Sequence, residues 1–268
     1  MYFLCSFYTK IVHPAPETAL IRAKIRQTAH LIPENGAKPM HYNRRQCLAA
    51  SGSTPLREDP SLSEAAGLKV LTCRTDTLHA SSILTGKPAD PAHRRRAGRA
   101  LGQVLGQFQP GTRVLCAGIG NPAVTPDSLG PRCIAKLVPS PDTVPALFTV
   151  APDVPARTGI DTAGLIRAAA QLVRADCIIT VDALAAQSED SLASLIQITD
   201  RGTEPGSGTE ESQSSAVTEE TMGIPVISVG VPTVIESGNL LVTPADCDLI
   251  ADIFSGILAW GITSALFR

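Results

Sequence analysis

Residues 113–131 read RVLCAGIGNPAVTPDSLGP, and this stretch decides the fold. Its first five residues form a short apolar run bounded by glycine, which is typical of a buried strand. A Gly-rich loop follows at 118–131, and a helix is expected to begin near Gly130. A strand, a tight loop and a helix in this order are the first half of the unit from which parallel sheets are built.

Short apolar segments and helical segments alternate on both sides of this stretch. Strands are predicted at 67–72, 146–150, 177–181, 195–199 and 225–229, and helices at 91–108, 161–173 and from about Pro244 onward. This alternation predicts an α/β fold of three layers, a mostly parallel twisted sheet with helices on both faces. We expect one such domain over residues 67–268.

The first 66 residues lack this pattern. Six prolines interrupt them, and their apolar residues show little periodicity. We therefore expect a poorly ordered N-terminal extension over residues 1–66. Met40 offers a second start, so residues 1–39 are expected to contribute little to the folded domain.

Composition argues against several classes of function. Aromatic residues make up only 4% of the chain and the net charge is −2, so direct binding of nucleic acid is not expected. Residues 1–113 hold 16 Lys and Arg against 7 Asp and Glu, a charge of +9, whereas residues 114–268 hold 7 against 18, a charge of −11. All five histidines lie in the basic part. Unless that part reaches into the site, a His-based triad or a His-ligated metal is excluded.

Cysteine usage and hydropathy favour a cytoplasmic protein with no membrane partner. The seven cysteines are odd in number and include no C-x-x-C pair, which is typical of a reducing compartment. The apolar residues 2–8 lack the flanks of a signal peptide. The largely apolar run at 249–267 contains Asp252, and we expect a buried helix there that packs on the sheet rather than a membrane span.

Two aspartates that follow predicted strands are the candidate catalytic residues. Asp127 lies in the loop after the strand at 113–117, and Asp182 comes directly after the strand at 177–181. Ligands of such sheets bind at the carboxyl ends of the strands, where two close carboxylates can share a proton. One can then activate water while the other protonates a leaving group. The alternative is that both aspartates are caps of turns and strand ends, and position alone favours this alternative.

The Gly-rich loops are weaker signals. The GIGN at 118–121 is a poor dinucleotide fingerprint, because Ala123 stands at the third glycine position and Pro122 removes a backbone donor. We expect these glycines to expose backbone amides instead, and we expect no cofactor. The loop at 200–208 (DRGTEPGSG) follows a predicted strand and suits substrate binding, although its composition alone favours a flexible connector.

Motifs along residues 113–267 occur in the order of one peptidase family. They are GIGN at 118–121, TPDSLGP at 125–131, TGIDT at 158–162, VDALAA at 181–186, IQITD at 196–200, PGSG at 205–208, GIPVI at 223–227, GVPTV at 230–234 and NLLVTP at 239–244. Together they resemble the germination proteases, the endopeptidases of spore-forming bacteria that degrade small acid-soluble spore proteins.

The resemblance implies the fold of the phosphorylase-like and hydrogenase-maturation peptidases. It places the family's two essential aspartates at Asp127 and Asp182, which would activate water without a covalent intermediate, a cofactor or an obligatory metal. Backbone or amide donors to the scissile carbonyl would come from Gly120, Asn121, Gly206, Ser207 and Gly208.

The resemblance also implies a biological setting. The partners would be small acid-soluble spore proteins as substrate and further copies of the chain, since the family forms tetramers. The protein would be made as a zymogen with a short propeptide in the forespore cytoplasm. The sequence departs from the family at 209–213 (TEESQ), which is acidic where the family is basic, and at Gln187, where the family has arginine. Between Val234 and Asn239 a long family insertion is missing.

Two alternatives remain open. One is a non-catalytic or regulatory spore protein that keeps the peptidase fold and binds a peptide. The other is a metal-dependent peptidase, in which Asp127, Asp182 and Glu236 would provide oxygen ligands.

Overall fold

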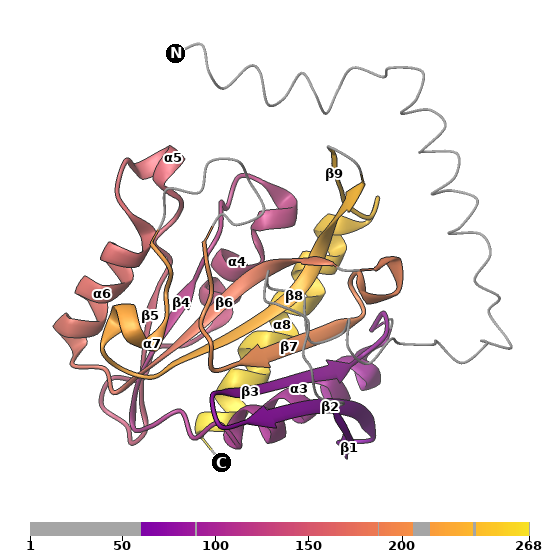
Figure 1. Cartoon of the computed structure of the whole chain (residues 1–268), viewed down its shortest axis with the longest axis horizontal. Coiled ribbons are helices and arrows are strands. Elements are labelled where there is room, and N and C mark those ends of the chain that lie inside the picture. Colours follow the sequence, from indigo (N-terminus) through magenta and orange to yellow (C-terminus); the bar gives the residue numbers. More distant parts are fainter. Residues whose placement is uncertain (1–59, 89, 187, 206–214, 238–239, 268) are drawn as a thin grey trace, which may run out of the picture. The chain divides into compact units, whose positions relative to one another are not determined.

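The computed structural model describes residues 60–88, 90–186, 188–205, 215–237 and 240–267. Within these residues a nine-stranded sheet carries helices on both of its faces (Figure 1). The predicted α/β architecture is thus confirmed. The predictions for the N-terminal extension as far as residue 59, including the Met40 start, and for Gly206, Ser207 and Gly208 lie outside the described residues.

The sheet has a parallel centre and an antiparallel side. Its strands are β1 (Ser61–Ala65), β2 (Leu68–Thr75), β3 (Leu78–Leu84), β4 (Arg113–Gly118), β5 (Ala146–Val150), β6 (Cys177–Ala186), β7 (Leu195–Thr199), β8 (Val226–Ser237) and β9 (Leu240–Val242). They lie in the order β1-β2-β3-β7-β8-β6-β4-β5, and β9 pairs with β8. β5, β4, β6 and β8 pair in parallel, whereas β1, β2, β3 and β7 continue the sheet in antiparallel pairs.

The parallel strands are those that the sequence shows most clearly. β4 and the first six residues of β6 are almost entirely buried, since helices cover both faces, and buried parallel strands carry continuous apolar runs. β6 and β8 both extend beyond the predicted runs, and their pairing shifts register between Leu184 and Ala185. β1 lies inside the range 1–66 that we assigned to the extension, so the sheet begins at Ser61, earlier than expected.

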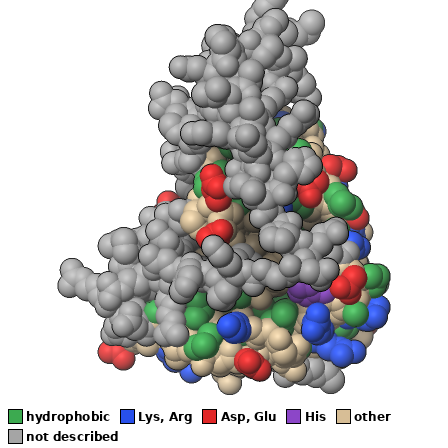
Figure 2. Space-filling model, turned by 90° about the vertical axis from the view of Figure 1, so that its right-hand side faces the viewer, with side chains coloured by type: hydrophobic (Ala, Val, Ile, Leu, Met, Phe, Trp, Pro, Cys, Tyr) green, Lys and Arg blue, Asp and Glu red, His purple; other side chains and the backbone are tan. Residues whose placement is uncertain are grey.

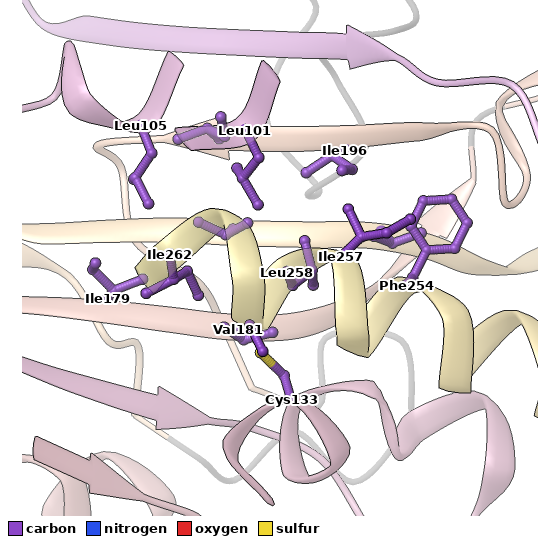
Figure 3. Packing of buried hydrophobic residues seen from close by; sticks show 14 of the residues in the cluster. Leu101, Leu105, Cys133, Ile179, Val181, Ile196, Phe254, Ile257, Leu258 and Ile262 are labelled. Carbon is purple, nitrogen blue, oxygen red and sulfur yellow. The ribbon is translucent and has the colours of Figure 1, made fainter. Parts of the chain in front are cut away.

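The helices form two layers. They are α3 (Pro91–Gly106), α4 (Leu129–Lys136), α5 (Pro155–Thr158), α6 (Thr162–Val173), α7 (Glu219–Met222) and α8 (Cys247–Leu266), with short 3-10 turns η1 (Thr125–Asp127) and η2 (Glu189–Ser191). α3, α4 and α8 pack on one face of the sheet and α6 on the other (Figure 1). The larger core lies under α3 and α8, where Leu101, Leu258 and Ile262 meet Ile179 of β6 (Figure 3).

α8 is the apolar run that we expected to be a buried helix, and this prediction is confirmed. Among the described residues it is the helix long and apolar enough to cross a membrane, but 56% of its apolar window is buried in the protein. It packs closely on α3, where a Cβ at Gly261 would lie 2.6 Å from the Leu101 side chain. Close backbone approach and burial are properties of a core helix.

Charge is also distributed as the sequence predicted. The basic run on α3 is a solvated helix face, since Arg95, Arg96 and Arg99 are exposed. Figure 2 shows Lys and Arg side chains, in blue, mostly in the lower part of the described surface. The two candidate aspartates lie elsewhere in the chain, Asp127 in the loop after β4 and Asp182 within β6.

Candidate active site

β4 ends beside the middle of β6. Because β6 continues to Ala186, Asp182 lies within this strand and not directly after it as we predicted. The two strands are parallel neighbours, with Gly118 opposite Val181. One residue further, the backbone N–H of Ile119 donates to the carbonyl oxygen of Val181 at 2.8 Å. Asp182 follows Val181 directly, and Asp127 lies in the loop that leaves β4. The structure therefore brings the two sequence-predicted aspartates onto neighbouring segments.

The loop after β4 holds Asp127 in a fixed place. The backbone N–H of Asn121 donates to Asp127 Oδ2 at 2.6 Å, and the Thr233 hydroxyl of β8 donates to the carbonyl oxygen of Pro126 at 2.7 Å. Gly120 has a φ of +120°, and a Cβ there would lie 2.0 Å from the Asp127 carbonyl oxygen. Glycine is needed at this position because any other side chain would displace the loop. Helix α4 begins after Ser128, so Asp127 is not its N-cap.

Asp182 is buried, with 9% of its surface exposed. Its Oδ1 accepts the backbone N–H of Ala183 at 2.7 Å, and its Oδ2 accepts the Thr203 hydroxyl at 3.1 Å. Thr203 is held in turn by a pair of backbone hydrogen bonds with Val217, of 3.0 and 2.8 Å. Thr203, from the segment after β7 where the sequence analysis considered a substrate-binding loop, thus contacts Asp182 in the middle of β6.

Burial gives both carboxyl groups a raised pKa. The pKa of Asp127 is raised to about 6, mainly by loss of water and also by the charge of Asp153, against the hydrogen bond from Asn121 that lowers it. Burial, followed by the charge of Asp127, raises the pKa of Asp182 to about 7, against hydrogen bonds from Ala183 and Thr203. A charge on either carboxylate opposes the ionisation of the other, so the two groups titrate together and can hold one carboxylate and one carboxylic acid near neutral pH.

Asn121 is used differently from our expectation. Its backbone N–H, which we predicted as a donor to substrate, donates to Asp127. Its side-chain Oδ1 accepts from the backbone N–H of Ala123 at 2.9 Å and from Arg157 Nη1 at 3.0 Å. The side-chain Nδ2 is the remaining donor of this residue. Gly120 keeps its predicted place beside Asp127, and the role of both residues toward substrate stays a prediction.

Three residues in this region escaped the sequence analysis. Arg157 forms an ion pair with Asp153, with 3.1 Å between Nε and Oδ2, and both lie next to the Asp127 loop through Asn121. Thr203 reaches Asp182 from 21 residues further along the chain. No motif marks these side chains, because they meet the aspartates only after the chain has crossed the sheet. Only the position of Thr203 in the loop at 200–208 gave a signal.

The side chains of the alternative metal site are only partly described. Of its three proposed residues, Asp127 and Asp182 lie on neighbouring segments, whereas the side chain of Glu236 lies outside the described ones. No group of three His, Cys, Asp or Glu side chains suited to a metal occurs within the described part of the chain. The described histidines do not join the aspartates: His79 of β3 stacks on Phe108, and His93 lies on α3.

Comparison with known proteins identifies the relatives of this chain. The family model described as "Germination protease" matches residues 103–238, which include both aspartates. The germination protease of Caldanaerobacter subterraneus subsp. tengcongensis is 37% identical over 144 residues, covering 50% of this chain and 44% of that protein. The one of Clostridium acetobutylicum is 32% identical over 213 residues, covering 57% and 65%. That of Geobacillus sp. (strain WCH70) is 40% identical over 137 residues, covering 47% and 37%. The chain spans less than two thirds of the length of these relatives.

The similarity to solved structures is weaker. The [NiFe] hydrogenase maturation protease HycI from Thermococcus kodakarensis KOD1 aligns with a TM-score of 0.36 and 20% identity. The alignment covers 58% of this chain and 98% of that protein. A likeness at this level has no bearing on function.

Proposed function

The chain belongs to the germination protease family, and from that premise we propose that it is an endopeptidase that degrades small acid-soluble spore proteins during germination. One observation carries the proposal. Asp127, in the loop after β4, and Asp182, on the neighbouring β6, lie within the matched segment, and burial raises the pKa of each toward the range where acid–base catalysis works at neutral pH.

The two carboxyl groups have different partners, and these suggest different roles. Asp127 accepts a short hydrogen bond from a backbone N–H, which favours its ionised form. Asp182 is more deeply buried, and both this burial and the charge of Asp127 favour its protonated form. The Thr203 hydroxyl can accept that proton in a hydrogen bond as readily as it can donate one. We therefore assign the base to Asp127 and the acid to Asp182.

Hydrolysis then follows from proton transfers between these groups and water. Asp127 removes a proton from a water molecule while the water oxygen attacks the carbonyl carbon of the scissile bond. Asp182 gives its proton to the peptide nitrogen, and the C–N bond breaks as the new carboxyl product forms. Asp127 then releases its proton to water and Asp182 takes up a proton from water, which restores the starting state. Each transfer of this kind contributes about 10²–10⁴ in rate.

The substrate is proposed to lie extended across the strand ends. Nδ2 of Asn121, the backbone at Gly120 and the residues Gly206, Ser207 and Gly208 are the proposed donors to its carbonyl groups. An extended peptide would place its scissile bond over the loop after β4 and the segment of Thr203. The site of action would be the forespore cytoplasm, and assembly into a tetramer, as in the family, is part of the same proposal.

Incubation with a purified small acid-soluble spore protein tests this function. Two preparations should be compared, the full chain and a form that starts at Met40, with fragments identified by mass spectrometry. We expect cleavage at discrete sites that persists in the presence of EDTA. Binding without fragments in both preparations would favour the non-catalytic alternative, and loss of cleavage with EDTA would favour the metal-dependent one.

A further inference from the structure

Arg157 joins the two segments that flank Asp127. It lies on α5, after β5, and its guanidinium has two partners on different segments. Nε lies 3.1 Å from Asp153 Oδ2, and Nη1 donates to Asn121 Oδ1 at 3.0 Å. Asn121 is the residue whose backbone N–H donates to Asp127. A single residue, Asn121, therefore connects Arg157 to the candidate base Asp127.

Asp153 is held beside this loop by its own contacts. Its backbone has a positive φ of 64°, its Oδ1 accepts the backbone N–H of Val154 at 2.9 Å, and its carbonyl oxygen accepts the Thr162 hydroxyl at 3.1 Å. The carboxylate cannot turn away from the loop without breaking its bonds to Val154 and Arg157. A fixed negative charge next to Asp127 disfavours the ionised form that a general base needs. Arg157 pairs with Asp153 at 3.1 Å, and its positive charge should offset this effect.

We propose that Arg157 is a positioning residue for the catalytic pair: it orients Asn121 toward Asp127 and neutralises Asp153, and so maintains Asp127 as a carboxylate. The assignment of Asp127 as base rests on the proposed function. The contacts of Arg157 and their effect on the ionisation of Asp127 do not depend on it.

The other charges around Asp127 leave this role to Arg157. Asp182 faces it from β6 but carries the proton in the proposed starting state, so it adds no charge beside Asp127. Helices α4 and α8 also pack against η1, and their charged side chains pair with each other, Arg132 with Asp248 and Lys136 with Asp252. Burial is the main cause of the raised pKa of Asp127, and the charge of Asp153 adds to it. Loss of Arg157 should therefore raise this pKa further.

Because the ion pair is exposed, the effect of Arg157 on the ionisation of Asp127 can be measured separately from its effect on folding. The Arg157 side chain is 43% exposed, and pairs at such positions contribute little to stability. Substitution of Arg157 should change the ionisation of Asp127 while the melting temperature stays close to that of the wild type.

A set of charge variants tests the proposal. The carboxyl carbon of Asp127 would be titrated by ¹³C NMR in wild type, Arg157→Gln, Arg157→Lys, Asp153→Asn and the double variant, with Asp127→Asn to assign the signal. Arg99→Gln, which removes an exposed arginine of α3, is the matched control. The pH profile of spore-protein cleavage would be recorded for the same proteins.

The expected changes in the pKa of Asp127 follow the charge of the substituted side chains. Arg157→Gln should raise the apparent pKa of Asp127 by about half a unit or more, and Asp153→Asn should lower it. The double variant and Arg157→Lys should return it toward wild type, and Arg99→Gln should leave it unchanged. The acidic limb of the cleavage profile should move with these values.

Two results would overturn the proposal. One is an unchanged titration of Asp127 in Arg157→Gln, and the other is a shift that Asp153→Asn fails to reverse in the double variant. If the titrations move as expected but no protein of the set cleaves substrate, the role of Arg157 stands and the proposed function fails.

Discussion

Replacing Asp182 by asparagine should stabilise the folded protein at pH 8, because the buried carboxylate opposes folding. Its pKa is raised from 3.8 to about 7, mainly by burial and then by the charge of Asp127. Below pH 3.8 the group is protonated in the folded and unfolded chains and has no effect. As the pH rises toward 7, the unfolded chain loses the proton and the folded chain keeps it, so the free energy of unfolding falls.

The size of this effect follows from the shift. A shift of about three units, at about 1.4 kcal/mol each, sets a ceiling of about 4 kcal/mol above pH 7. An asparagine amide can keep both contacts of the carboxyl group, since its oxygen accepts from Ala183 and its nitrogen donates to Thr203. We therefore expect Asp182→Asn to be more stable than wild type by about 2 kcal/mol or more at pH 8, and by little at pH 4.

Urea denaturation at pH 4, 5, 6, 7 and 8 measures this difference. Asp176→Asn is a control with the opposite sign. Although burial acts to raise the pKa of Asp176, hydrogen bonds from Arg113 and Thr112 lower it overall. That variant should lose stability at pH 7 and approach the wild type in acid. A stability difference for Asp182→Asn that does not change with pH would refute the reasoning, as would a loss of stability at pH 8.

Three further changes test parts of the site. Gly120→Ala places a Cβ 2.0 Å from the Asp127 carbonyl oxygen, so cleavage should fall at least ~10-fold and unfolding free energy by about 1–3 kcal/mol; wild-type values for both would show that the loop is not constrained. Thr203→Val removes a hydrogen bond that lowers the pKa of Asp182, so the alkaline limb of the cleavage profile should move to higher pH, and an unmoved limb would exclude Asp182 as the acid. Deletion of residues 1–39 should leave the melting temperature nearly unchanged by calorimetry, and a large drop would show that they belong to the fold.

The sequence revealed the parallel centre of the sheet better than its antiparallel side. β4 and β6 are continuous apolar runs because both of their faces are buried. β3 was missed because it carries His79, Ser81 and Ser82, polar residues that are nevertheless buried. The Ser81 hydroxyl lies 3.0 Å from that of Thr72, on the neighbouring β2. A polar side chain satisfied by a neighbouring strand cannot be recognised from the pattern of one strand alone.

The candidate site was predicted in part. Position alone favoured caps for Asp127 and Asp182, and the resemblance of the surrounding motifs to one family changed that interpretation. The partners of the aspartates were not predictable in the same way. Arg157 acts across two segments and Thr203 comes from beyond β7, and such contacts depend on how the chain crosses the sheet. A family motif identifies the reacting groups, whereas the groups that set their pKa values emerge only from the fold.

The rate of spore-protein cleavage by Asp127→Asn and Asp182→Asn, compared with wild type and with Asp176→Asn, tests the central claim most directly. Each substitution keeps the size of the side chain and removes a proton-transfer group. We expect each to lower the rate by about 10²–10⁴, while Asp176→Asn cleaves at the wild-type rate under conditions where it is folded. Cleavage at the wild-type rate by either catalytic variant would contradict a mechanism in which the two carboxyl groups act together.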